Sequence, residues 1–374
     1  MSVFEIASQM GTCEVHVLHD NETNLRAAVA IHDTRLGPAI GGTRMYAYQS
    51  GDEAIMDVVR LARGMTHKAA LAGLPHGGGK AVIWADSKRP VTDRRAFMEA
   101  FGRFVDRLGG RYITCEDSGT STADMDVVRG VTKHVLGVSK SLGGSGDPSP
   151  FTALGVRRGI EAAAEVVLGH HSLKGMHVAI LGVGAVGSHL AEELHAAGCS
   201  LTIADVNQAR VDAMVARTGA RVVSVDELPG VTCDVYAPCA LGGAINDKSI
   251  GQLRCKIIGG AANNQLATRE MGEVLKQKGI FYAPDYAINA GGLINVAQEY
   301  KGYDAAASTE KVMQVRETIA EIARRSQRTG ESPAVIADKM VEEILARAGD
   351  QPMSTSAIPG GGNGQPRRVR DTNV

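Results

Sequence analysis

The chain lacks the cysteine and histidine patterns that mark metal centres and disulfide scaffolds. Its 6 cysteines include no C-x-x-C pair, and its 11 histidines include no H-E-x-x-H spacing. Reduced thiols and no metal site are therefore expected. There are 40 basic and 41 acidic residues, giving a net charge of −1, with no basic block outside the last few residues. This balance favours neither nucleic acid nor a charged membrane surface as a partner.

Long apolar runs are also missing. No stretch reaches the roughly 20 apolar residues that a membrane-spanning helix needs. The first residues, Met1 to Glu5, lack the basic region and apolar core of a secretory signal. We therefore expect a soluble, cytoplasmic protein without a membrane partner. A chain of 374 residues is long enough for two domains, and two domains imply a cleft between them.

A glycine-rich turn predicts a dinucleotide-binding site. An apolar strand over 177–181 runs into Gly182-x-Gly184-x-x-Gly187, which opens a helical pattern. Gly182 permits the tight turn, and Gly184 lets the backbone approach a pyrophosphate. Gly187 lets helix and strand pack closely. The start of the helix, with Ala185 and Val186, presents unpaired N–H groups to the anion.

The next strand ends at Asp205, and this residue indicates which nucleotide binds. A carboxylate here accepts hydrogen bonds from both ribose hydroxyls and repels a 2′-phosphate. NAD is therefore favoured over NADP, although Arg210, one turn further on, keeps NADP open as an alternative.

Two lysines among glycines predict a second site. Lys68 follows Gly64-Met-Thr-His, and Lys80 follows three glycines at 77–79. Glycines let the backbone come close to a small anionic substrate that the lysines would meet. A helix over 53–63 with Gly64 as its stop would place both lysines beyond a helix end. A phosphate-binding loop is excluded, because Leu74 and Ala81 stand where that motif needs Gly and Ser or Thr.

Asp117 is the third candidate for chemistry. A strand over 112–114 runs into Cys115-Glu116-Asp117, and a helix starts near Ser121 or Thr122. Catalytic side chains are common where a strand ends and a turn begins. An isolated aspartate at this place would be read as a turn or capping carboxylate. The two lysines favour catalysis instead.

The order of elements predicts an α/β protein. We expect a substrate-binding and oligomerisation domain over 1–142 and a Rossmann-type, doubly wound NAD-binding domain over 150–330. The Gly143-Gly-Ser-Gly-Asp-Pro stretch between them is typical of a hinge. A C-terminal helix over 331–348 is expected to pack back on the first domain, and residues 349–374 to form a disordered tail.

Several segments together resemble the amino acid dehydrogenase superfamily over about residues 10–345, and in particular the leucine, valine and phenylalanine dehydrogenases, with leucine dehydrogenase the nearest. They are Gly37–Met45, Gly64–Lys68, Gly77–Lys80, Glu116–Met125, Asp147–Thr152 and Ala261–Leu266. The resemblance implies reversible, NAD-dependent oxidative deamination of an L-amino acid to a 2-oxo acid and ammonia. It also implies a homo-oligomer, either a dimer or an octamer.

The resemblance assigns roles to individual residues. Lys68, assisted by Gly41 and Gly42, would hold the substrate carboxylate. Lys80 would activate the water that attacks the iminium. For this role the Lys80 amine must be neutral, which burial and a neighbouring cation would favour. Asp117 would shuttle the proton to and from the substrate nitrogen and would be the partner of Lys80.

The resemblance also assigns contacts to the cofactor and to the substrate. Asn263 would contact the substrate or the nicotinamide ribose. Cofactor contacts are also implied for Thr152, Cys239 and Ala240.

The side-chain pocket is expected to be apolar, with Ile40, Cys115, Leu293 and Val296 as its wall. An apolar wall cannot satisfy a second carboxylate, so glutamate is disfavoured. Leucine-like and aromatic substrates stay open, because one or two methylenes change discrimination by only about 1–3 kcal/mol. A phenylalanine or tryptophan dehydrogenase is therefore one alternative. A non-catalytic NAD-sensing protein is an alternative of another class, against which the lysines and Asp117 argue. His76 has no assigned role.

Overall fold

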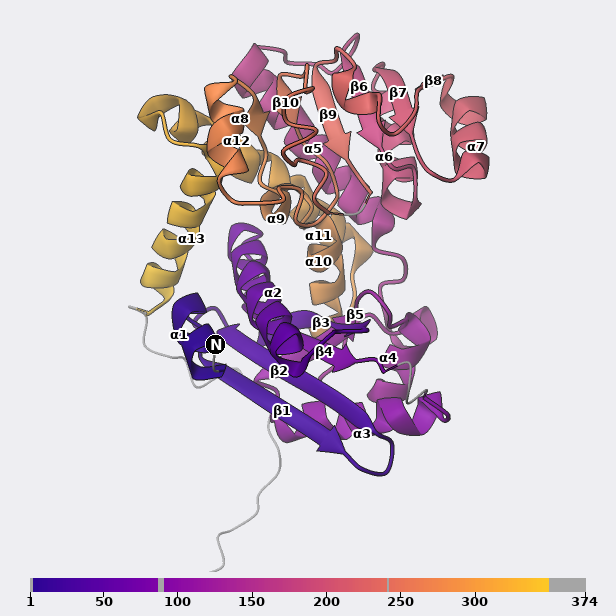
Figure 1. The fold of residues 1–374 in the computed structure, drawn as a ribbon, viewed down its shortest axis with the longest axis vertical. Coiled ribbons are helices and arrows are strands. Elements are labelled where there is room, and N and C mark those ends of the chain that lie inside the picture. Colours follow the sequence, from indigo (N-terminus) through magenta and orange to yellow (C-terminus); the bar gives the residue numbers. More distant parts are fainter. Residues whose placement is uncertain (1–2, 87–90, 241, 350–374) are drawn as a thin grey trace, which may run out of the picture.

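A computed structural model describes residues 3–86, 91–240 and 242–349, so the tail predicted over 349–374 lies outside it except for Gly349. Figure 1 shows two α/β domains, the first (indigo to purple) below the second (magenta to orange). No helix in the described ranges is long and apolar enough to cross a membrane. The α/β class and the Rossmann-type second domain predicted from the sequence are confirmed.

The first domain is built on a mixed five-stranded sheet of order β1-β2-β4-β3-β5. Its elements are α1 (Val3–Met10), β1 (Glu14–Asp20), β2 (Leu25–Asp33), β3 (Ala39–Tyr46), α2 (Gly51–Leu71), β4 (Gly77–Trp84), α3 (Arg94–Arg107), β5 (Tyr112–Glu116), α4 (Thr122–Arg129) and the 3₁₀ turn η1 (Lys140–Leu142). β3 pairs in parallel with both β4 and β5, whereas β2 is antiparallel to β1 and β4. Helix α2 packs on one face of the sheet, and α3 and α4 cover the other. β3 therefore separates the strand of Lys80 from the strand that leads to Asp117.

Helix α2 is longer than predicted. It begins after the N-cap Ser50, whose side chain accepts a hydrogen bond from the Glu53 N–H, and it continues past Gly64 to Leu71. Gly64 in a helix interior costs about 1 kcal/mol relative to alanine, but buried side chains on both sides, from Val58 to Ala70, hold the helix against the sheet. The prediction that Gly64 ends the helix is wrong. Lys68 lies in the last turn of α2 rather than beyond it.

The second domain has a fully parallel six-stranded sheet of order β11-β10-β9-β6-β7-β8. Its elements are α5 (Ser149–Leu168), β6 (His177–Leu181), α6 (Ala185–Ala196), β7 (Ser200–Ala204), α7 (Gln208–Thr218), β8 (Arg221–Val222), η2 (Leu228–Gly230), β9 (Val235–Pro238), β10 (Ile257–Ile258), α8 (Met271–Gln277), β11 (Phe281–Tyr282), α9 (Asp285–Ile288), α10 (Gly291–Ala297), η3 (Gln298–Lys301), α11 (Ala305–Met313), α12 (Val315–Thr329) and α13 (Pro333–Gly349). The strand order reverses between β6 and β9. This is the switch point at which doubly wound sheets bind ligands.

Several elements of this domain are short. β8, β10 and β11 have only two residues each, and α8 has seven. Helices α11 and α12 are separate and meet at Gln314. The C-terminal helix predicted over 331–348 is α13.

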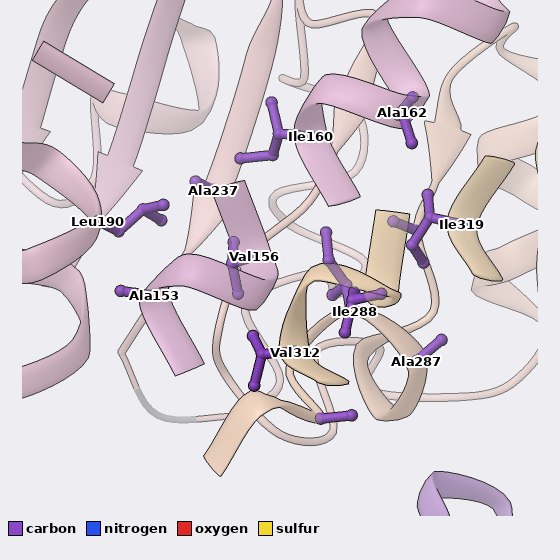
Figure 2. Packing of buried hydrophobic residues seen from close by; sticks show 14 of the residues in the cluster. Ala153, Val156, Ile160, Ala162, Leu190, Ala237, Ala287, Ile288, Val312 and Ile319 are labelled. Atoms are coloured by element: carbon purple, nitrogen blue, oxygen red, sulfur yellow. The ribbon is translucent and has the colours of Figure 1, made fainter. Parts of the chain in front are cut away.

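Helix α5 lies at the centre of the main core. Figure 2 shows its Ala153, Val156 and Ile160 among apolar side chains of neighbouring elements, including Leu190 of α6 and Ile319 of α12. Strand residues alternate between the two faces of the sheet: Val178 and Ile180 of β6 join this core, and Ala179 joins a second core on the opposite face.

The C-terminal helix connects the two domains. In Figure 1, α13 (yellow) descends from the second domain beside α2. The Nε2 atom of His67 lies 3.5 Å from Oδ1 of Asp338 in α13, and the guanidinium of Arg35 donates to the Leu345 carbonyl at 3.4 Å. Helix α2, which carries Lys68, is therefore in contact with both domains.

Candidate active site

Backbone contact between β4 and α2 sets the positions of the two lysines. Lys80 is buried in β4, and Lys68 is half-buried in the last turn of α2. A side chain at Gly78 would collide with the backbone and hydroxyl of Thr66 in α2, and one at Gly79 would come within 2.8 Å of the Tyr112 ring. The glycines before Lys80 are thus explained by close packing of strand, helix and ring. That they also give a substrate access to the backbone stays a prediction.

Lys80 and Asp117 form an ion pair. Their Nζ and Oδ2 atoms are 2.6 Å apart, although they come from β4 and from the loop after β5, with β3 between them. The pair passes over Gly41 and Gly42 of β3, where a side chain on Gly42 would lie 2.8 Å from the Cβ of Asp117. The glycine pair therefore makes room for the contact between lysine and aspartate.

Asp117 is held as a carboxylate. Burial alone would raise its pKa, but the charge and hydrogen bond of Lys80, together with the charge of Arg44, outweigh burial and hold the pKa at about 2. Arg44 lies on the same side as Lys80, with its Nε 3.5 Å from the same Oδ2 atom. The sequence placed Arg44 in a family segment without giving it a role.

Pairing between β3 and β4 is interrupted at Gly41 and Gly42, which remain paired with β5. β3 pairs with β4 at Ile40 and again at Thr43, with no paired residues between them. The Gly41 carbonyl accepts a hydrogen bond from the Tyr112 hydroxyl at 2.6 Å. The interruption is at the level of Lys80, next to the ion pair.

Lys68 contacts the second domain directly. Its Nζ donates to Oδ1 of Asn263, in the loop after β10, at 3.2 Å. The same oxygen accepts from Nδ2 of Asn289 at 2.8 Å. Burial, with help from the nearby Lys80 charge, lowers the pKa of Lys68 to about 8, while Asp285 and Asp117 act in the opposite direction. Asn289 was given no role from the sequence, where its only signal is its place before Gly291 and Gly292.

The residues of the expected pocket wall lie in one apolar cluster. Ile40 of β3, Cys115 of β5 and Val296 of α10 are buried in it, and Leu293 packs against it. Burial raises the pKa of the Cys115 thiol to about 12, so this cysteine is neutral at physiological pH. These residues come from both domains. That they form the wall of a substrate pocket stays a prediction.

The glycine-rich turn lies at the switch point of the second sheet, between β6 and α6. Gly182 has φ +91°, a conformation that favours glycine. Added side-chain atoms at Gly184 would meet only Arg210, 3.8 Å away, whereas at Gly187 they would collide with the Gly182 carbonyl. Gly184 therefore faces open space. No side chain caps α6, so its first N–H groups are available to an anion, which fits a dinucleotide pyrophosphate.

Asp205 follows β7 and lies beside the turn. One carboxylate oxygen accepts from the Val183 N–H and the other from the Asn207 N–H, both at 2.8 Å. These two bonds fix the carboxylate at the end of the strand. Arg210, at the start of α7, is exposed next to Gly184.

The other expected cofactor residues fall around the same switch point. Cys239 follows β9, and its N–H donates to the Leu181 carbonyl at 2.7 Å. Ala240 lies next to the Gly182 turn. Thr152 is in the first turn of α5, where its hydroxyl donates to the Pro148 carbonyl at 3.1 Å.

Within the described ranges, no group of three or more His, Cys, Asp or Glu side chains could hold a metal ion. The absence of a metal stays a prediction from the sequence.

His76 has a packing role. It is buried, its Nδ1 lies 3.3 Å from the Pro38 carbonyl, and its ring stacks edge-on against Tyr300 of η3 at 5.5 Å between centroids. Burial lowers its pKa. His76 thus joins the loop before Lys80 to the segment that follows the pocket wall.

Three models of known protein families match parts of the chain. Residues 8–134 match the Glu/Leu/Phe/Val dehydrogenase dimerisation domain, and residues 201–335 match the glutamate/leucine/phenylalanine/valine dehydrogenase domain. Residues 156–239 also match the NAD-binding domain of D-isomer specific 2-hydroxyacid dehydrogenases. This last match covers the glycine-rich turn and Asp205.

Individual relatives cover nearly the full chain. A leucine dehydrogenase of Bacillus cereus is 46% identical over 92% of this chain and 94% of its own. A valine dehydrogenase of Streptomyces coelicolor is 44% identical over 92% and 95%. The crystal structure of L-tryptophan dehydrogenase from Nostoc punctiforme matches with a TM-score of 0.83 and 39% identity, over 93% of this chain and 100% of that one. Since two family models and relatives of this identity span both domains, the chain belongs to the glutamate/leucine/phenylalanine/valine dehydrogenase family.

Proposed function

We propose that the chain catalyses the reversible, NAD-dependent oxidative deamination of a branched-chain L-amino acid, leucine above all, to the 2-oxo acid and ammonia. The observation that carries the proposal is the Lys80–Asp117 ion pair, which lies with Lys68 at the border of a Rossmann-type domain. The leucine and valine dehydrogenase relatives support the reaction class and the branched-chain substrate. NAD is the cofactor that the match to an NAD-binding domain supports.

In this mechanism the lysines and Asp117 divide the work. The Lys68 ammonium binds the substrate carboxylate. This carboxylate either replaces the Asn263 side chain as the hydrogen-bond acceptor of Lys68 or accepts alongside it. The Gly182–Gly187 turn and Asp205 would hold NAD, which would supply the acceptor for the hydride of the substrate α-carbon. Lys80, as the neutral amine, removes a proton from the water that attacks the resulting iminium carbon. Asp117, a carboxylate in the resting enzyme, takes a proton from the substrate ammonium before hydride loss and returns it to the departing nitrogen. Ammonia then leaves and the 2-oxo acid is formed, while the protons of the attacking water pass through Lys80 to solvent.

The wall of Ile40, Cys115, Leu293 and Val296 supports the choice of an apolar side chain. A glutamate side chain would bury its second carboxylate there without a partner, at a cost of several kcal/mol. An aromatic substrate is the second candidate, because the L-tryptophan dehydrogenase of Nostoc punctiforme shares the fold at 39% identity. The non-catalytic NAD-sensing alternative is disfavoured by family membership together with the paired Lys80 and Asp117.

Initial rates on a substrate panel test the proposal. NADH formation should be measured with leucine, valine, phenylalanine, tryptophan, alanine and glutamate, and repeated with NADP. We expect leucine to lead with NAD. An aromatic lead would select the second candidate, and NAD binding without turnover on any amino acid would favour the sensing protein.

The proposal includes a homo-oligomer, either a dimer or an octamer, and a cytoplasmic location. The match of residues 8–134 to a dimerisation domain supports self-association. Sedimentation equilibrium would distinguish two subunits from eight, and a monomer would contradict this part of the proposal.

A further inference from the structure

Arg44 bridges two carboxylates next to the proposed catalytic pair. It lies in β3, and its Nη1 atom is 3.0 Å from Oδ2 of Asp57 in α2. Its Nε atom is 3.5 Å from Oδ2 of Asp117, the oxygen that also meets Lys80 at 2.6 Å. The Nε atom is buried and has no hydrogen-bond partner of its own. Two cations therefore face one carboxylate oxygen.

Asp57 holds the guanidinium in this position. Besides Arg44, it accepts a hydrogen bond from the Tyr48 hydroxyl at 2.7 Å and pairs with Arg60 at 2.9 Å through its other oxygen. Anchored in this way, Arg44 presents only its Nε edge to Asp117. Because the contact from Arg44 Nε is the longer one, Lys80 is the nearer partner of Asp117 Oδ2.

The two cations differ in chemistry. A guanidinium keeps its charge at every pH at which the enzyme works, whereas an amine exchanges its proton. When Lys80 is neutral, Asp117 would be a largely buried carboxylate without a contacting cation if Arg44 were absent, and burying an unpaired charge is unfavourable. A fixed positive charge this close also disfavours a proton on the Lys80–Asp117 pair.

We propose that Arg44 is a positioning residue for proton transfer: it keeps Asp117 ionised while Lys80 is neutral, and thereby sets the pH above which the pair is reactive. The inference rests on the proposed roles of Lys80 and Asp117. It assigns to the β3 arginine a function that is separate from substrate binding.

Other charged or titratable groups also face the pair, and they must stay constant in the test. They are Lys68 and Asp57 from α2, Tyr48 from the loop before α2, Tyr112, Cys115 and Glu116 from β5, and, next to Lys68, Asp285 from α9. Burial keeps Tyr48, Tyr112 and Cys115 neutral by raising their pKa values. Among these groups Lys68 loses its charge on the alkaline side, because its pKa is about 8. The test therefore uses the acid limb of the pH profile of kcat/KM.

The experiment compares pH profiles of kcat/KM for wild type, Arg44→Met and Arg60→Met. Arg60 is a matched control, because it pairs with the same Asp57 but through the oxygen that faces away from Arg44. Loss of the Arg44 charge makes the pair hold its proton more tightly. The acid limb should therefore move to higher pH by about one unit or more, while Arg60→Met keeps the wild-type limb.

Two further variants keep the test decisive if Arg44→Met fails to fold, as thermal unfolding would reveal. Asp57→Asn removes the anchor and leaves the Arg44 charge free to approach Asp117, so its acid limb should move to lower pH. Arg44→Lys keeps a charge and should restore part of the wild-type limb. A limb that stays in place in every folded Arg44 and Asp57 variant overturns the inference. If wild type turns over no amino acid, the proposed function itself fails, which is a different result.

Discussion

Lys68 of the first domain and Asn263 of the second are in contact, with the lysine Nζ donating to the asparagine Oδ1 at 3.2 Å. Asn289 donates to the same oxygen, so the oxygen end of the Asn263 amide is occupied, and no described residue accepts a hydrogen bond from its NH₂ group. A substrate carboxylate arriving at Lys68 would therefore find two donors, the ammonium and this NH₂ group. With the substrate carboxylate bound at Lys68 as proposed, substrate binding and the contact between the two domains would involve the same atoms.

Carboxylate binding should weaken as the pH rises through about 8. Burial lowers the pKa of Lys68 to about 8, and only the ammonium form attracts a carboxylate. The KM for the 2-oxo acid of leucine in the reductive direction should therefore increase above this pH. Lys68→Arg stays charged and should show no such increase. The same pH dependence in both proteins would assign the titration to another group.

Lys80→Ala should nearly abolish turnover while NAD still binds. Lys80 lies in the first domain and the glycine-rich turn in the second, so the two functions are separable. A general acid or base contributes about 10² to 10⁴ in rate, and the loss should be at least of this size. The measurements are NADH formation at saturating substrate and a fluorescence titration with NAD. Asp117→Asn should behave similarly, and appreciable activity of Lys80→Ala would remove this lysine from the proposed role.

Asp205→Ser should narrow the preference for NAD over NADP. The carboxylate is fixed beside the turn by the Val183 and Asn207 N–H groups, and it repels a 2′-phosphate. Arg210 is exposed nearby and could then attract that phosphate. The ratio of kcat/KM for the two cofactors measures the effect. Equal use of both cofactors by wild type would contradict this interpretation of Asp205.

Leucine should exceed alanine by roughly ten- to a hundredfold in kcat/KM. Burying a leucine side chain against the apolar wall is worth about 1.5–3 kcal/mol, most of which alanine forgoes. Glutamate should be poorer still, because its second carboxylate would be buried unpaired. Phenylalanine stays open. Measured kcat/KM values decide, and glutamate or alanine outperforming every branched-chain and aromatic substrate would rule out the apolar pocket.

The segment predicted as a hinge is hydrogen-bonded to Glu299 of the second domain. The Glu299 carboxylate accepts from the Ser145 N–H, within this segment, at 2.7 Å and from the Gly137 N–H, before it, at 2.8 Å. We expect NAD with a substrate analogue to compact the protein in solution scattering. In Glu299→Gln only one N–H keeps an acceptor, so the unliganded protein should be more extended than wild type. Identical profiles with and without ligand would indicate a rigid cleft or a hinge elsewhere.

Local features of the site were predictable from sequence because they depend on neighbours in the chain. The turn at Gly182 and Gly187 is such a case, since a positive φ and a close helix–strand approach leave a readable spacing. Contact between Lys80 and Asp117 depends on strand order instead, with β3 between their strands, and it was reached through family resemblance alone. The helix end at Gly64 was wrong because packing of α2 on the sheet outweighs the local cost of one glycine.

Because Gly78 packs closely on Thr66, the spacing of the two lysines depends on other residues than the proposed choice of substrate. Backbone contact between β4 and α2 sets the spacing of the two lysines, whereas the side chains proposed to choose the substrate come from β3, β5 and α10. Substitutions at Val296 or Leu293 can therefore reshape the acceptance of amino acids without altering the spacing of the reacting groups. The second domain is the place to begin a redesign of this enzyme for synthesis of unusual amino acids.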